Sequence, residues 1–308
     1  MDYARIAETL FKLGVAMAIG YVLRKKKMFT ADTNRSLSGL ILNVTCPALI
    51  VYAVCGQQEV NPEVLRLLGF GALMYLVLPL LAMVLVPKFF TPADQRGVYR
   101  LLLVFGNVNF MGFPVVQALY GAQAIFYINI LNIPFTLLMF TYGVRQLHLR
   151  SGATPVKMRP ADILTPGLIA GLLALFLYFT HLTVPSLLVE TLGFVGGVTT
   201  PLSMVVIGSM IADFSFREMF SQRKLFFLSA LKLLVLPALG LLVARLVFPT
   251  GDMAGIIMVS LAMPSASLCA MVCKQYGTQA QADTAALGVF LTTALSMVTL
   301  PVVLLLLR

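Results

Sequence analysis

Charged residues are scarce in this chain of 308 residues: they make up 11% of the sequence, whereas 59% of the residues are hydrophobic. About a quarter of the residues of a soluble domain are charged, so the composition excludes an ordinary soluble fold. Apolar runs of about 20 residues, the length that crosses the hydrocarbon core of a bilayer, recur along the chain. The alternating segments of about ten residues that mark a membrane β-barrel are missing. The sequence therefore predicts an all-α, polytopic membrane protein embedded in the lipid bilayer.

Residues with catalytic or metal-binding chemistry are also few. The chain has two histidines and four cysteines, and no two cysteines form a CxxC pair. It contains no HExxH, GxSxG or phosphate-loop motif, so we expect neither enzyme activity nor a bound metal or cofactor. Acidic residues are rare within the apolar runs, and a relay of carboxylates for protons is therefore not evident.

The excess of basic residues lies in short loops. The formal net charge is +10, but no basic stripe with interleaved aromatic residues indicates nucleic acid as a partner. Most of the 22 Lys and Arg residues fall in the odd-numbered loops between ten apolar segments. By the positive-inside rule these loops are cytoplasmic, so we expect a multi-pass protein of the cell (plasma or inner) membrane with both termini outside. The predicted segments are residues 4–23, 37–55, 65–86, 98–119, 124–145, 162–181, 186–211, 223–247, 252–275 and 281–307.

The two halves of the sequence resemble each other. Five segments in each half is an odd number, so the second half must enter the membrane from the opposite side. This predicts an inverted repeat, which is frequent among secondary transporters, with repeats at 1–146 and 162–308 and a cytoplasmic loop at 147–161. A duplicated scaffold that transports nothing is the alternative. The shared motifs are V-T-x-P at 44–47 and 198–201, L-V-L-P at 76–79 and 234–237, and Y-G-x-Q-A at 120–124 and 276–280.

The fourth segment of each half contains residues that suit a membrane helix poorly. Proline removes a backbone donor and clashes with the preceding turn. Backbone groups freed in this way are tolerated at membrane depth only where protein buries them or where they line a cavity. We therefore expect helices that are interrupted around Asn107–Pro114 and Met263–Ser267 and meet near the midplane. The candidate residues are Asn107, Asn109, Gly112, Phe113 and Pro114 in the first half and Pro264, Ser265 and Ser267 in the second.

An interruption of this kind can bind an anion. The first N–H groups of a half-helix are unpaired and carry a partial positive charge, which favours a carboxylate. The amides of Asn107 and Asn109 and the hydroxyls of Ser265 and Ser267 can donate further hydrogen bonds. A simple kink with local polar capping is the alternative interpretation.

Other polar residues and prolines within the apolar segments are further candidates. Pro47 and Pro201 either kink their helices or also border the cavity. Asn129 and Asn132 are three residues apart and share a helix face, so they point into the cavity or bond a neighbouring helix. Lys232 is the one cation well inside a segment. It either snorkels to the cytoplasmic interface, holds the place of a coupling cation, or supports the interrupted ninth helix.

Four motifs together resemble the auxin efflux carrier family. They are G-N-V-N-F-M-G-F-P at 106–114, L-K-L-L-V-L-P at 231–237, M-P-S-A-S at 263–267 and Q-Y-G at 275–277. The resemblance covers nearly the whole chain and implies ten helices in two inverted five-helix repeats, with broken helices 4 and 9 crossing as in bile-acid symporters and related antiporters. It implies a scaffold of helices 1, 2, 6 and 7, a mobile transport domain of helices 3–5 and 8–10, an elevator-type movement and a homodimer.

The resemblance also implies which asparagine lies at the helix crossing and which class of substrate is carried. The crossover asparagine of the family falls on Asn107, whereas Asn109 stands where a small or apolar residue is common. Plant members carry auxin, and bacterial members, whose short central loop this chain shares, are associated with malonate, malate and other carboxylates.

We therefore expect a secondary transporter of small organic anions that works by alternating access. An anion channel or a membrane sensor of the same fold is the alternative, although a channel needs a continuous polar lining and the polar residues here concentrate at two positions. The sequence does not identify the substrate, and it leaves protons, sodium or no ion as the coupling ion.

Overall fold

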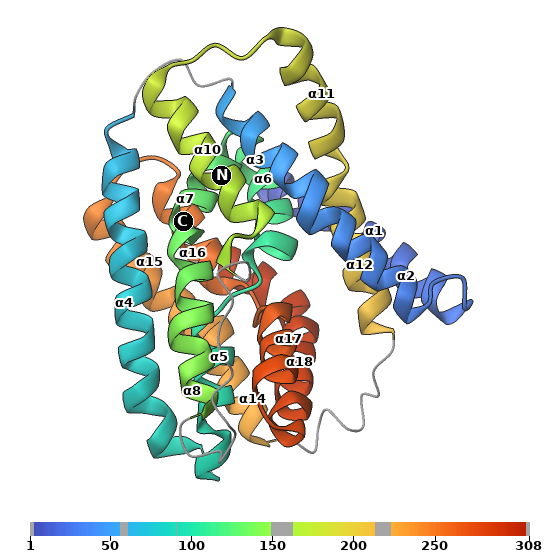
Figure 1. The fold of residues 1–308 in the computed structure, drawn as a ribbon, viewed down its shortest axis with the longest axis vertical. Coiled ribbons are helices and arrows are strands. Elements are labelled where there is room, and N and C mark those ends of the chain that lie inside the picture. Colours follow the sequence, from blue (N-terminus) through green and yellow to red (C-terminus); the bar gives the residue numbers. More distant parts are fainter. Residues whose placement is uncertain (1–2, 56–60, 91, 149–162, 213–222, 306–308) are drawn as a thin grey trace.

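The computed structural model describes residues 3–55, 61–90, 92–148, 163–212 and 223–305, and these residues are helical almost throughout (Figure 1). Six of the described helical stretches are long and apolar enough to cross a membrane, and two shorter apolar helices lie among them. The chain is therefore a polytopic, multi-pass membrane protein. The six stretches are Ala31–Cys55, Glu63–Phe89, Ala124–His148, Ser186–Ile211, Arg223–Val247 and Gln279–Leu304, and the shorter helices are Pro166–Thr180 and Met253–Ala262.

Helical residues occupy each of the ten predicted segments. The first half contains α1 (Tyr3–Lys25), α2 (Ala31–Leu40), η1 (Ile41–Thr45), α3 (Cys46–Cys55), α4 (Glu63–Phe89), η2 (Ala93–Gln95), α5 (Arg96–Val104), η3 (Val108–Gly112), α6 (Phe113–Tyr120), α7 (Ala124–Leu138), η4 (Met139–Gly143) and α8 (Val144–His148). The second half contains α10 (Pro166–Thr180), α11 (Ser186–Gly197), α12 (Thr199–Ile211), α14 (Arg223–Ala230), η5 (Leu231–Val235), α15 (Leu236–Val247), α16 (Met253–Ala262), α17 (Ser267–Tyr276) and α18 (Gln279–Leu304).

Local sequence explains where several helices begin. At the start of α18 the side chains of Thr278 and Gln281 bond each other's backbone N–H groups in a capping box. At the start of α10 the hydroxyl of Thr165 accepts a hydrogen bond from the N–H of Leu168, and Pro166 follows directly. Proline is favourable there because its missing N–H is one that the helix does not need.

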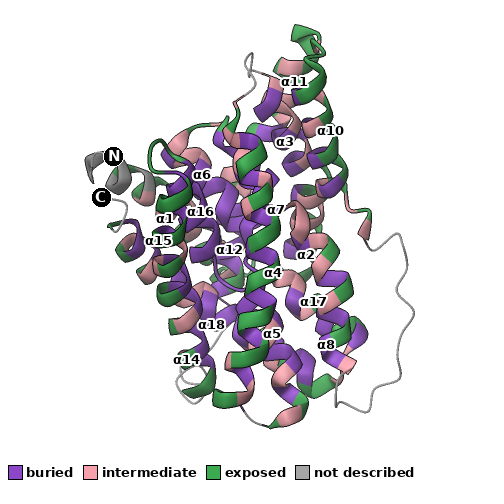
Figure 2. Ribbon diagram, turned by 90° about the vertical axis from the view of Figure 1, so that its left-hand side faces the viewer, coloured by how far each residue is buried: buried purple, intermediate pink, exposed green. Residues whose placement is uncertain are grey.

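Buried residues lie on the helix faces toward the middle of the bundle, and exposed residues lie on the outward faces (Figure 2). On α4, Leu67 and Leu78 are buried, whereas Leu65, Leu73 and Leu80 are exposed. A helix with apolar residues on all sides is expected where one face meets protein and the other meets lipid. The exposed leucines of α4 therefore mark a lipid-facing surface.

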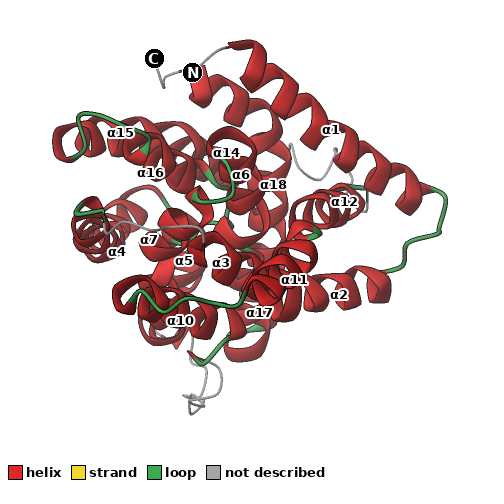
Figure 3. Ribbon diagram, turned by 90° about the horizontal axis from the view of Figure 1, so that it is seen from above, coloured by secondary structure: helices red, strands yellow, loops and turns green. Residues whose placement is uncertain are grey.

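Helices α1 and α12 lie side by side and approach each other closely (Figures 1 and 3). A Cβ atom on Gly20 would collide with the backbone carbonyl of Val205, and one on Gly208 would collide with that of Met17. Small residues permit this close approach, which is common at helix interfaces in membranes. Each of the two helices thus contributes one glycine that lets the backbone of the other helix pack closely against it.

We predict that Gly20→Ala lowers the thermal stability of the purified protein in detergent, because overpacking costs roughly 1–3 kcal/mol. The control is Gly14→Ala on the same helix, where an added Cβ would meet nothing within 4 Å. Alanine is more favourable than glycine within a helix by roughly 0.5–1 kcal/mol, so the control should keep or slightly raise the melting temperature. Equal melting temperatures for the two variants would contradict the interpretation of this interface.

Candidate functional site

Two interrupted helices meet within the bundle. Gly106 and Ser265 pair as a short antiparallel bridge. The N–H of Asn107 donates to the carbonyl of Pro264 at 2.7 Å, and the N–H of Ala266 donates to the carbonyl of Phe105 at 3.0 Å. Each interruption therefore satisfies backbone groups that the other leaves without a helical partner.

The first interruption lies earlier than the sequence predicts. Helix α5 ends at Val104, the non-helical residues are 105–107, and η3 has already begun at Val108. Pro114 is therefore not inside the gap but further along the chain, in α6, which continues directly from η3. The second interruption covers residues 263–266, and Ser267 begins α17, close to the predicted position.

Side chains from two further helices support the meeting point at the carboxyl end of α5. The hydroxyl of Ser265 donates to the carbonyl of Leu102 at 2.7 Å, and the ammonium of Lys232 donates to the carbonyl of Leu103 at 2.8 Å. The N–H of Ser265 donates to the hydroxyl of Thr292 on α18 at 3.1 Å. Buried backbone groups need such partners, so η5 and α18 help to stabilise the interrupted conformation of the two helices.

A chain of polar side chains leads to the amino end of η3, which follows the first interruption. The Tyr75 hydroxyl on α4 donates to the amide oxygen of Asn132 at 2.7 Å. The amide nitrogen of Asn132 in turn lies 3.4 Å from the amide oxygen of Asn109. The amide of Asn107 donates to the Ser267 hydroxyl at 3.3 Å, which joins the starts of η3 and α17. Four predicted residues thus gather around the two helix starts.

Asn129 lies on the same helix as Asn132 but contacts a different neighbour. Its amide nitrogen is 2.7 Å from the place where a Cβ on Gly171 of α10 would lie. Asn129 is buried, and that nitrogen has no hydrogen-bond partner among the described residues. The structure therefore brings Asn132 to the interruptions and Asn129 to α10.

The other predicted residues are spread around this centre. Gly112 packs closely against Val108, Ile128 and Met263, and Phe113 is fully buried. Pro47 lies half-buried at the start of α3, and Pro201 is exposed on α12. The neighbour of Pro201, Thr200, donates its hydroxyl proton to the amide oxygen of Gln117 on α6 at 2.6 Å. Sequence reasoning missed Gln117, although a polar residue in an apolar helix could have indicated it.

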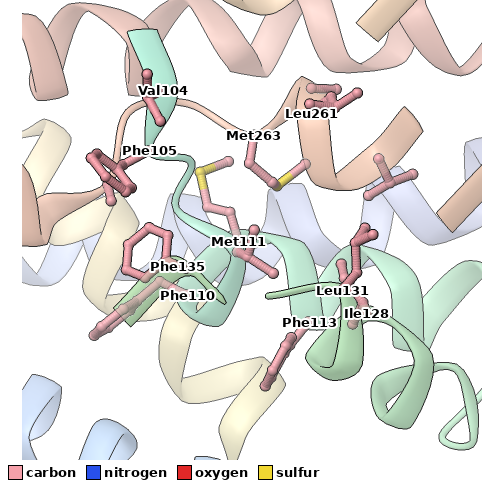
Figure 4. Packing of buried hydrophobic residues seen from close by; sticks show 14 of the residues in the cluster. Val104, Phe105, Phe110, Met111, Phe113, Ile128, Leu131, Phe135, Leu261 and Met263 are labelled. Atoms are coloured by element: carbon pink, nitrogen blue, oxygen red, sulfur yellow. The ribbon is translucent and has the colours of Figure 1, made fainter. Parts of the chain in front are cut away.

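Aromatic and methionine side chains surround the meeting point. Figure 4 shows Phe105, Met111 and Met263 close to the two interrupted segments. The rings of Phe105 and Phe135 pack edge to face with their centroids 5.2 Å apart. Such walls exclude water and lower the local dielectric, which strengthens the interaction of helix ends with a charged solute.

The chain matches a family of membrane transport proteins over residues 5–304. It therefore belongs to this family, the auxin efflux carriers, which are transporters. An uncharacterized transporter of Methanocaldococcus jannaschii is 23% identical over 297 residues, which cover 92% of each chain. An uncharacterized transporter of Methanothermobacter thermautotrophicus is 23% identical over 313 residues, which cover 98% of each chain.

We predict that Thr292→Val destabilises the protein by roughly 1–3 kcal/mol, because it leaves the buried N–H of Ser265 without an acceptor. The control is Thr293→Val. The Thr293 hydroxyl bonds only the Val289 carbonyl of its own helix among the described contacts. Thermal unfolding in detergent should show a clear loss for the first variant and a small change for the second. A larger loss for Thr293→Val would be inconsistent with a supporting role for Thr292.

Proposed function

We propose that the protein is a secondary transporter of small organic anions, such as monocarboxylates or dicarboxylates, with its binding site where the two interrupted helices meet. The observation that carries the proposal is the hydrogen bond between Asn107 and Ser267, which places the starts of η3 and α17 together. The first N–H groups of each have no partner within their own helix. The N–H of Val108 already donates to the Gly106 carbonyl at 2.9 Å. The other first N–H groups, two amides and a hydroxyl form a set of donors that suits a carboxylate.

In this proposal the chain has ten spans in two inverted repeats. The bridge between Gly106 and Ser265 is antiparallel, which is the direction expected of equivalent segments that cross the membrane in opposite senses. The backbone hydrogen bonds are symmetric as well, because each interruption donates one N–H bond to a carbonyl of the other. The distribution of Lys and Arg in the loops supports a cell-membrane location with both termini outside.

Alternating access in this proposal comes from an elevator-type movement. Helices α4 to α8 and α14 to α18 form the mobile transport domain, and α1 to α3 and α10 to α12 form the scaffold, which also joins two copies in a homodimer. The hydrogen bond from Thr200 to Gln117 crosses this boundary. Water can replace a bond of this kind at little cost, which is compatible with a boundary that slides.

We predict that Asn107→Ala lowers the uptake of malonate or malate into proteoliposomes by about 10- to 100-fold, which corresponds to one lost hydrogen bond to a charged solute. The control is Asn43→Ala, because Asn43 is exposed on η1. Saturable uptake that survives Asn107→Ala would overturn the assignment of the site. Currents far above carrier turnover would indicate a channel instead, and tight binding without flux would indicate a sensor.

We also predict that a short cross-link between cysteines placed at Gln117 and Thr200 stops uptake, because it ties the mobile domain to the scaffold. Cleavage of the cross-link by a reductant should restore uptake, and each single cysteine variant should be insensitive to the reagent. Unchanged uptake by the cross-linked protein would rule out movement along this boundary.

A further inference from the structure

Lys232 is buried in the bundle, although lysine is the most strongly hydrated of the basic side chains. Its residue is 2% exposed, and its ammonium donates to the carbonyl of Leu103 on a helix 129 residues away in sequence. It belongs to η5, a π-helical turn between α14 and α15. Such turns are frequent at functional sites. The side chain therefore does not extend to the membrane surface, as snorkelling requires.

The hydrogen-bond partner of Lys232 is a backbone carbonyl at the end of α5 and not a carboxylate. Among the described residues, no Asp or Glu forms an ion pair with it. A small cavity next to it is lined by Leu103 and Val104 from the end of α5 and by Ser260 and Leu261 from the end of α16. The carboxyl end of a helix carries about half a negative charge, so two such ends offer roughly one negative charge to one ammonium.

The same place is where a transporter with interrupted helices holds a coupling cation. In secondary transporters, unwound carbonyls and the carboxyl ends of half-helices coordinate sodium or protons, while the amino ends face an anionic substrate. Here Lys232 stands at the carboxyl ends of α5 and α16, and Asn107 and Ser267 stand at the amino ends of the helices that follow. The cavity has a free volume of about 10 Å³, room for about one water molecule beside the ammonium.

We propose that the ammonium of Lys232 is a built-in cation that replaces a sodium ion at the paired carboxyl ends of the interrupted helices, so that transport requires no sodium. This inference rests on the proposed function. The tethered charge neutralises the helix ends in every state of the cycle, and it moves with the transport domain. Lys232 is in this sense a positioning residue: it keeps the interruptions in the geometry that binds the anion without contacting the anion.

The test measures malonate uptake into proteoliposomes in sodium and in sodium-free choline buffer. The wild-type protein should give equal rates in the two buffers. Lys232→Met, which keeps the length but not the charge, should lower uptake by about tenfold or more, which is the loss of a charge-assisted hydrogen bond. The control Lys224→Met changes a lysine that is exposed at the start of α14 and should transport normally.

A smaller side chain gives the decisive readout. Lys232→Ala leaves space at the helix ends, so methylammonium or sodium should restore uptake to this variant and raise its melting temperature, and neither should affect the wild type. Lys232→Met, whose side chain fills the space, should not be rescued. A merely structural lysine would give variants that lose stability without any response to added cations.

The outcomes separate this inference from the proposed function. Wild-type protein that transports no carboxylate at all overturns the proposed function and, with it, the role of Lys232. Wild-type uptake that depends on sodium, or full uptake by Lys232→Met, overturns only the inference about Lys232. The sodium test on the wild type needs no variant and therefore stands even if Lys232→Ala does not fold.

Discussion

The structure depends on one constraint: a backbone N–H or carbonyl at membrane depth must have a partner. An interrupted membrane helix breaks this rule unless something replaces the lost bonds. Here the two interruptions replace some of them for each other around the bridge between Gly106 and Ser265, and Ser265, Lys232 and Thr292 supply further bonds. The same arrangement keeps the helix ends inside the protein, at the proposed anion site.

The interruptions also separate partial charges within the bundle. Each gap creates a carboxyl end that is partly negative and an amino end that is partly positive. Lys232 lies at the carboxyl ends, whereas the neutral donors Asn107 and Ser267 lie at the amino ends. The Lys232 ammonium neutralises the partly negative carboxyl end of α5, whereas the amino ends of η3 and α17 keep their partial positive charge, which favours an anion. This polarity links the unusual buried lysine to the proposed anion site.

Sequence reasoning located the interruptions because proline, glycine and asparagine are unfavourable inside a membrane helix. It misplaced the first gap because a proline within a helix and one that interrupts it look alike in sequence, and Pro114 lies within the helical residues of η3 and α6. It could not separate Asn129 from Asn132, since residues three apart share a face but reach different neighbours, here Gly171 and Asn109. The partner of Lys232 is a backbone carbonyl, which has no sequence signature.

The measurement that tests the central claim most directly is an experimental structure of the protein in a lipid nanodisc at a saturating concentration of malonate. The account predicts density for the dicarboxylate between Asn107 and Ser267, in contact with the first N–H groups of η3 and α17, while both helices remain interrupted. Continuous helices through residues 105–107 and 263–266, or malonate bound elsewhere with this position closed, would contradict it.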